Sequence, residues 1–261
     1  MFLSTRIMAE RQLEAAQLAY NSASNWPVGS GISYVHQFVD MSSVEIPGVG
    51  RTCKAAMGYS FAAGTTDGPG AAEIASRGQG MLEGTPLWDT IRDVLILLLS
   101  TDPPTAEDYL CHAPKPVLLP TGWMNVPYAW HPSIVDIQML RIGELVILLA
   151  PSEFTAMAGR RLKRAVEQAL RANGVLEPRV LIAGVSNVYT HYVTTPEEYE
   201  AQRYEAASTL YGKHTLDAYI LKFVALVRPV LTTYHALSDL QRLSRPRYLC
   251  LELSIVSEFD L

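Results

Sequence analysis

The sequence predicts an α/β fold, a mixed sheet with flanking helices, and three features of residues 145–185 support this prediction. Val146 to Ala150 is a short apolar run rich in branched residues, typical of a buried strand. A helical pattern over about 155–173 follows, and Gly174 occupies the usual position of a left-handed C-terminal cap. Residues 180–185 form a second apolar strand. This order of strand, helix and strand predicts a right-handed crossover between parallel strands.

The residues before the crossover predict further elements. In residues 4–23 apolar side chains recur between polar positions, which predicts an amphipathic helix with one buried face. Residues 32–39 alternate as a strand does, with His36 on the more apolar side, where we interpret it as a packed residue and not a ligand. We expect the proline-rich residues 101–132 to be irregular. The alternation from Val135 onward predicts a hairpin that leads into the strand at Val146.

Two helices are predicted on either side of this region. Residues 86–100 form a helix whose second half is apolar all round, so it either packs against the sheet or exposes an apolar patch. Thr195 to Glu198 is a capping box with proline at the first helical position. We expect the helix that it opens to run to about Thr209 and to bring Tyr204 back to the edge of the sheet. A last helix from residue 214 is expected to break or kink at Pro229.

Composition excludes several classes of protein. The 261 residues carry a formal net charge of −5, which argues against nucleic-acid binding. No apolar run approaches the roughly 18 residues of a membrane span, so no transmembrane segment is expected. The N-terminus lacks the apolar core of a signal peptide. The three cysteines match no metal-site spacing.

The candidate site lies where two predicted strands end. Glu153 follows the first strand, and the polar run 186–195, with Tyr189, His191 and Tyr192, follows the second. In open α/β sheets ligands bind at this edge, which makes the cluster the best functional signal in the chain. Two structural explanations stay open at this point. A glutamate near a helix N-terminus is favoured by the helix dipole alone, and the aromatic residues can simply pack the loop.

Long motifs give the chain a specific resemblance. They are HQFVDM, TCKAAMGYSFAAGTTDGPG, LWDTIRD, HAPKPVLLPTG, PSEFTAMAGRRL and SNVYTHYVTTPEEYEAQRYEAASTLYG. Over roughly residues 1–224 the chain resembles the neutral ceramidase family, and we interpret it as the C-terminal part of that family's catalytic domain, truncated at both ends. We expect residues 225–261 to be a divergent C-terminal tail without the immunoglobulin-like domain of the family.

The resemblance implies an activity and a set of residues. Family members are zinc-dependent amidases that cleave ceramide into sphingosine and a fatty acid. By resemblance Glu153 and Tyr192 are zinc ligands, and Tyr204 stabilises the oxyanion or donates a proton. The two zinc histidines and the nucleophilic serine match family sequence that precedes Met1. With half of a zinc site, we expect the chain neither to bind zinc tightly nor to hydrolyse ceramide. A catalytically inactive ceramidase-like protein and a lipid-binding module without turnover are the alternatives.

The resemblance also implies a location and a disulfide. Family members act outside the cell or at its surface, where contact with a membrane or lipid surface is expected. Cys53 and Cys111 fall where the animal enzymes carry a disulfide, so we predict that they pair in an oxidising compartment. Two buried free thiols are the alternative. The basic cluster of residues 160–164 is interpreted as a solvated face with structural ion pairs in preference to a site for lipid headgroups.

Overall fold

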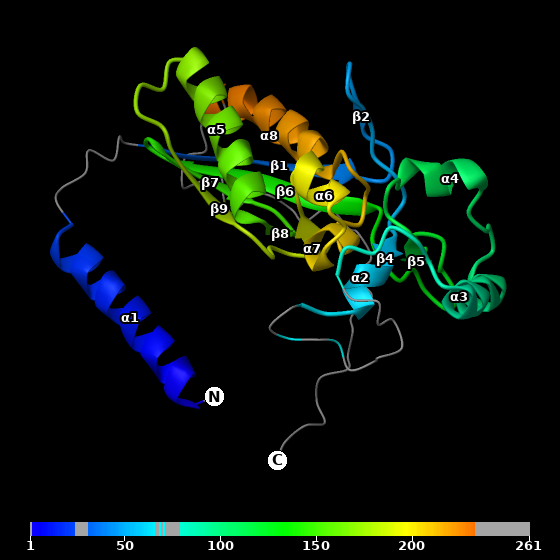
Figure 1. Ribbon diagram of the computed structural model, residues 1–261. Helices are drawn as coiled ribbons and strands as arrows, with labels where there is room; N and C mark the ends of the chain where they lie inside the picture. Colours follow the sequence, from blue (N-terminus) through cyan, green and yellow to red (C-terminus); the bar gives the residue numbers. More distant parts are fainter. Residues whose placement is uncertain (1, 24–30, 66–67, 69, 71–78, 233–261) are drawn as a thin grey trace.

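The computed structural model describes residues 2–23, 31–65, 68, 70 and 79–232 (Figure 1). The elements are, in chain order, α1 (Phe2–Asn21), β1 (Ile32–Asp40), β2 (Glu45–Ile46), β3 (Gly50–Arg51), β4 (Met57–Gly58), α2 (Tyr59–Ala62), α3 (Pro86–Leu99), α4 (Ala106–Cys111), β5 (Val117–Leu119), β6 (Ile134–Ile142), β7 (Leu145–Leu149), β8 (Glu153–Phe154), α5 (Ala156–Ala172), β9 (Arg179–Ala183), β10 (Tyr192–Val193), α6 (Pro196–Glu200), α7 (Tyr204–Ala207) and α8 (Thr215–Thr232).

The main sheet is mixed, as predicted. Its four strands lie in the order β1-β6-β7-β9. The pairs β1/β6 and β6/β7 are antiparallel, and Gly143 takes a positive φ of 60° in the hairpin between β6 and β7. β7 and β9 are parallel, with Val146 opposite Val180. The predicted order of strand, helix and parallel strand is therefore confirmed as β7–α5–β9.

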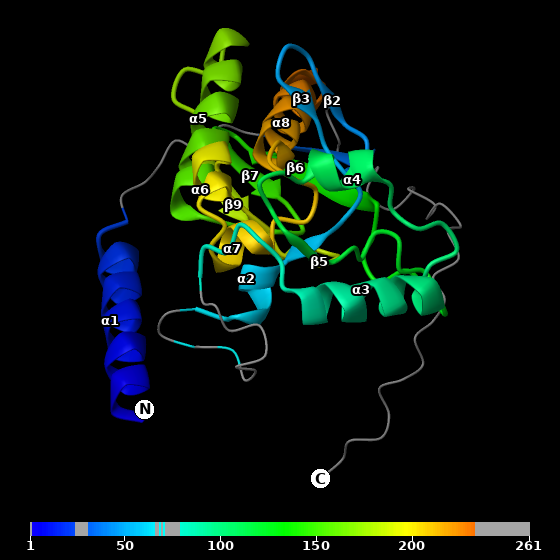
Figure 2. The same ribbon diagram turned by 45° about the vertical axis from the view of Figure 1, so that its right-hand side comes forward.

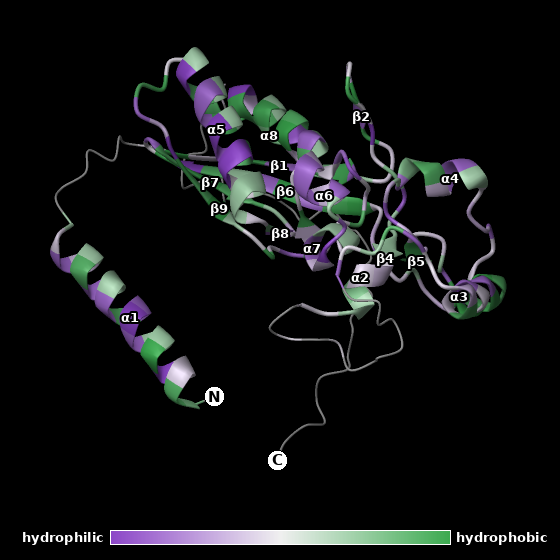
Figure 3. Ribbon diagram, viewed as in Figure 1, coloured by the Kyte–Doolittle hydropathy of each residue, from purple (hydrophilic) through white to green (hydrophobic). Residues whose placement is uncertain are grey.

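Helices α5 and α8 cover one face of this sheet (Figure 1). The core between them contains buried side chains of the strands, such as Ile137 and Leu148, and of the helices, such as Leu162 and Phe223. The burial pattern explains the hydropathy of the two helices. α5 is buried on one stripe only, whereas much of α8 is apolar (Figure 3).

No helix of the described residues covers the opposite face of the sheet in either view (Figures 1 and 2). Phe38 and Leu181 on that face are each 51% exposed. The prediction for β1 was wrong about its faces, because both sides of this strand carry apolar residues and alternation alone cannot choose between them. Ser33 and Val39 are buried, whereas His36 lies on the open face, 3.4 Å from a carboxylate oxygen of Asp136.

The N-terminal helix was predicted correctly, but its buried face was not. Every side chain of α1 is exposed, and the helix lies apart from the sheet in both views (Figures 1 and 2). Ile7 and Leu13 are six positions apart, about 240° around the helix, so the apolar residues form no single stripe. Within the described residues, no helix is both long enough and apolar enough to span a membrane.

Other predicted elements need correction. Residues 101–132 are not wholly irregular, because they contain α4, whose first turn is capped by Thr105, and β5. The helix predicted from the Thr195 capping box is divided into α6 and α7, since Gln202 takes a positive φ of 45°. α8 continues through Pro229 to Thr232, so the helix does not end at this proline.

The apolar half of α3 exposes an apolar patch, the second of the two outcomes predicted for it. Ile96 is buried, but Val94, Leu97 and Leu98 are 51%, 82% and 65% exposed. The helix therefore packs on a narrow side only.

The disulfide predicted between Cys53 and Cys111 is present. It joins the segment before β4 to the end of α4. Gly212 packs against it so closely that an added Cβ would lie 2.7 Å from the Cys53 sulfur.

Candidate active site

Glu153 and Tyr192 lie side by side on two short parallel strands. β8 pairs with β10 so that Tyr192 is opposite Glu153. The Glu153 amide donates to the His191 carbonyl at 2.8 Å, and the Thr155 amide donates to the Val193 carbonyl at 3.0 Å. Residues in register on paired strands point to the same face. The two predicted metal ligands are thus brought together by backbone pairing.

The Glu153 carboxylate accepts hydrogen bonds from tyrosines. The Tyr189 hydroxyl donates to Oε1 of Glu153 at 2.5 Å. Burial, followed by this hydrogen bond, raises the pKa of Tyr189 well above its ordinary value. Burial and a hydrogen bond to Glu153 likewise raise the pKa of Tyr192 to about 12. Both phenols are therefore protonated donors at neutral pH.

Tyr204 reaches the same place from the start of α7, as predicted. Its ring centroid lies 5.8 Å from that of Tyr192, and it stacks on Phe61 at 5.5 Å. The sequence alone does not mark Phe61 as a site residue. Its only signal is membership of the glycine-rich motif at residues 58–70, a region that the resemblance to the family places near the mouth of the active site.

Two histidines extend the cluster. The ring of His191 lies 4.8 Å from that of Tyr189 and 5.0 Å from that of His131. Burial lowers the pKa of both histidines, that of His131 to about 4, so both rings are neutral at pH 7. The sequence predicts no site role for His131, because nothing in it places this residue near the loop of His191.

A buried hydroxyl network lies beneath these residues. Ser152 Oγ is 2.6 Å from the Thr190 hydroxyl and 3.0 Å from the Tyr219 hydroxyl. The Tyr219 ring also packs edge-on against Phe154, with centroids 5.4 Å apart. Ser152 and Phe154 are the chain neighbours of Glu153. Tyr219 of α8 contacts both of them and so fixes the backbone on each side of Glu153.

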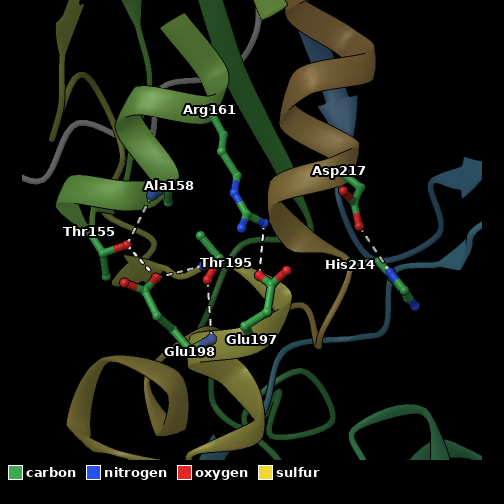
Figure 4. Close-up of polar contacts among 8 residues, drawn as sticks. All are labelled: Thr155, Ala158, Arg161, Thr195, Glu197, Glu198, His214 and Asp217. Atoms are coloured by element: carbon green, nitrogen blue, oxygen red, sulfur yellow. Dashed lines mark hydrogen bonds and ion pairs between the residues drawn. The ribbon is translucent and has the colours of Figure 1, made fainter. Parts of the chain in front are cut away.

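The starts of two helices follow directly after the two strands (Figure 4). Thr155 caps α5, where its hydroxyl accepts from the Ala158 amide at 3.2 Å. Thr195 and Glu198 form the predicted capping box of α6. A pocket of about 560 Å³ opens here, and its lining includes Tyr192, Thr194, Arg203 and Glu205. The site therefore combines an aromatic cluster with an open pocket.

The residues present do not by themselves fit a zinc ion. Carboxylate and phenol oxygens are suitable zinc donors, but a structural or catalytic site needs at least three protein ligands. The described ranges contain no group of three or more histidine, cysteine, aspartate or glutamate side chains placed to hold a metal. Glu153 and Tyr192 supply two donors at most.

The basic cluster on α5 makes local contacts. Arg161 forms an ion pair with Glu197 at 2.8 Å (Figure 4). The Arg160 guanidinium lies 3.7 Å from the sulfur of Met157. These contacts agree with the interpretation of a solvated face with structural pairs.

Comparison with known proteins establishes the family. A family model described as neutral/alkaline non-lysosomal ceramidase, N-terminal, matches residues 1–221. The chain belongs to the neutral ceramidase family. It is 48% identical over 241 residues to neutral ceramidase 3 of Arabidopsis thaliana, covering 88% of this chain and 31% of that protein. It is 44% identical over 245 residues to neutral ceramidase of Drosophila melanogaster, covering 88% and 33%.

Solved ceramidase structures share the fold. A structure titled ceramidase complexed with C2 superposes with a TM-score of 0.61 at 38% identity, over 80% of this chain and 32% of that chain. The neutral ceramidase of Pseudomonas aeruginosa gives 0.56 at 34% identity, over 80% and 30%. The chain thus spans about a third of the length of these relatives. None of the matches supports our placement of the chain in the C-terminal part of the catalytic domain.

Proposed function

We propose that this ceramidase-family protein serves the hydrolysis of the N-acyl amide of ceramide to sphingosine and a fatty acid. The observation that carries the proposal is the register of β8 and β10, which sets Glu153 beside Tyr192 with the Tyr204 ring 5.8 Å from that of Tyr192. Membership of the neutral ceramidase family supports the substrate class. The same proposal places the protein outside the cell or at its surface.

In this proposal Glu153 and Tyr192 are two ligands of a zinc ion, and the remaining donors come from outside the described residues. Zinc bound here would act as a Lewis acid on the amide carbonyl. Hydrogen bonds from Tyr189 and Tyr192 hold the Glu153 carboxylate in place.

Tyr204 has a separate role in the proposal. Its hydroxyl donates a hydrogen bond to the oxyanion of the tetrahedral intermediate or a proton to the leaving amine. The stack of Tyr204 on Phe61 fixes the ring, and the pocket beside Tyr192 offers room for the substrate. Preorganised donors of this kind are worth about 100- to 1000-fold in rate when they contact the oxyanion.

A second candidate function is lipid binding without turnover. It is favoured because the described residues contain no group of three or more histidine, cysteine, aspartate or glutamate side chains placed to hold a metal. In that case the aromatic cluster would contact ceramide, and Glu153 would act only as a hydrogen-bond acceptor.

Hydrolysis of a fluorescent short-acyl ceramide, with zinc added, separates these functions. For the amidase, we expect turnover to fall at least about 100-fold in Glu153→Gln. The matched control is Glu177→Gln, which makes the same change at an exposed position between α5 and β9 and should leave turnover almost unchanged. Turnover that survives Glu153→Gln contradicts the proposed site. Saturable ceramide binding with no turnover supports the lipid-binding module. A protein that neither binds nor hydrolyses ceramide contradicts both functions.

A further inference from the structure

One carboxylate joins the starts of the two helices that follow the candidate zinc ligands (Figure 4). Oε2 of Glu198 accepts a hydrogen bond from the Thr195 amide at 2.8 Å, which belongs to the capping box of α6. The same oxygen accepts a second bond, from the Thr155 hydroxyl, at 2.7 Å. Thr155 is the N-cap of α5. Glu198 therefore caps its own helix and reaches across to the cap of another.

The position of these two threonines gives the contact its importance. Thr155 lies two residues after Glu153, and Thr195 lies three residues after Tyr192. The ladder between β8 and β10 contains only two residue pairs and is extended by one backbone hydrogen bond at Thr155. So short a pair is marginal without further support. Glu198 supplies that support at the end where the strands turn into helices.

Geometry and charge both favour a carboxylate at this place. A negative charge near helix N-termini is stabilised by the amide dipoles of the first turn. The 17-residue α5 begins on one side of Glu198, and α6 begins on the other. A hydrogen bond with an ionised acceptor is also stronger than a neutral one.

We propose that Glu198 is a positioning residue that fixes the separation of Glu153 and Tyr192. It acts on the two ligands through Thr155 and Thr195. The inference rests on the proposed function for what the pair does, but the separation itself can be measured without activity.

The neighbouring residue provides a matched control. Glu197 is also a carboxylate of α6 that contacts α5, through its ion pair with Arg161 at 2.8 Å (Figure 4). Its side chain is 69% exposed, and the bonds that hold Glu198 to Thr155 and Thr195 do not involve it. Exposed ion pairs of this kind contribute little. Glu197→Ala thus removes a link between the same helices, together with a side-chain contact of Glu197 with Thr195, but keeps the bonds of Glu198 to both threonines.

The experiment compares Glu198→Ala, Glu198→Gln and Glu197→Ala. Proteins labelled with ¹³C in the tyrosine rings are examined by NMR, with the Tyr192 signal assigned from Tyr192→Phe, and kcat and KM are measured on fluorescent ceramide with zinc. We expect Glu198→Ala to shift the Tyr192 signal and to lower kcat about 10- to 100-fold with little change in KM, as for residues that orient metal ligands. Glu198→Gln keeps an amide oxygen as acceptor, so we expect its Tyr192 signal and its kcat to lie close to those of the unaltered protein.

Two results would overturn the inference. One is a folded Glu198→Ala protein whose Tyr192 signal is unchanged, and the other is an equal shift in Glu197→Ala. If Glu198→Ala does not fold, Glu198→Gln is compared with Thr155→Ala, a protein that lacks the hydroxyl bonded to Glu198. A Tyr192 signal that is the same in these two proteins contradicts the expected rescue. If the unaltered protein shows no turnover, the proposed function fails, while the NMR comparison still tests the positioning role.

Discussion

Tyr219 holds Glu153 at both of its neighbours. Its hydroxyl contacts Ser152, and its ring packs on Phe154. We predict that Tyr219→Phe, which keeps the ring, lowers the free energy of unfolding by about 1–3 kcal/mol, because buried hydroxyls lose a partner. Urea denaturation measures this. An unchanged midpoint would show that the network beneath the site contributes nothing to stability.

Buried histidines make the protein sensitive to mild acid. Burial lowers the pKa of His131 to about 4 and that of His112 to about 3. Both are neutral in the folded protein, whereas in the unfolded chain they bind protons as pH falls below about 6.5. Their contribution to stability is therefore complete above about pH 6.5 and decreases toward pH 4.

Unfolding at pH 7 and pH 5 tests this directly. We expect a smaller free energy of unfolding at pH 5, and a smaller difference between the two pH values in His131→Gln. Equal stability of the unaltered protein at both pH values would contradict the buried neutral state of these rings.

The sequence was informative about single residues where the chemistry is local. Glu153 and Tyr192 were placed together because both follow strands that end at one edge of a sheet, and the register confirms that they meet. Phe61 and His131 were missed because their contacts with Tyr204 and His191 span large separations in the chain. Nothing in their own neighbourhoods predicts such contacts.

Elements whose defining hydrogen bonds join residues close in the sequence could be predicted. The capping box of α6 and the hairpin at Gly143 are examples, since their hydrogen bonds lie within a few residues. The buried face of β1 was not predictable, because α8 decides it from nearly 200 positions away: the Ser33 hydroxyl donates to the Val230 carbonyl. The break between α6 and α7 depends on the backbone of Gln202, a residue with no turn signal.

The disulfide is the strongest link between elements outside the core. Cys53 and Cys111 are 58 residues apart. We predict that Cys53→Ala/Cys111→Ala lowers the free energy of unfolding by about 4 kcal/mol, because the unfolded chain regains the freedom of that loop. Thermal unfolding of the double variant and of the oxidised protein, without reductant, measures the loss. Equal stability of the two would contradict a structural role.

For the whole molecule, the fold class followed from one crossover, and long motifs gave the family. The chain spans about a third of the length of its relatives, and its own motifs gave no signal of which third that is. The open face of the sheet, with Phe38 and Leu181 half exposed, is a second property that no local pattern revealed.

The most direct test of the central claim, that Glu153 and Tyr192 form half of a zinc site, is the zinc content of the purified protein after equilibration with zinc and gel filtration. We predict less than one equivalent of zinc per chain, reduced further in Glu153→Gln, because two donors hold zinc weakly. One full equivalent that survives Glu153→Gln would contradict it, since the metal would then be held by other residues.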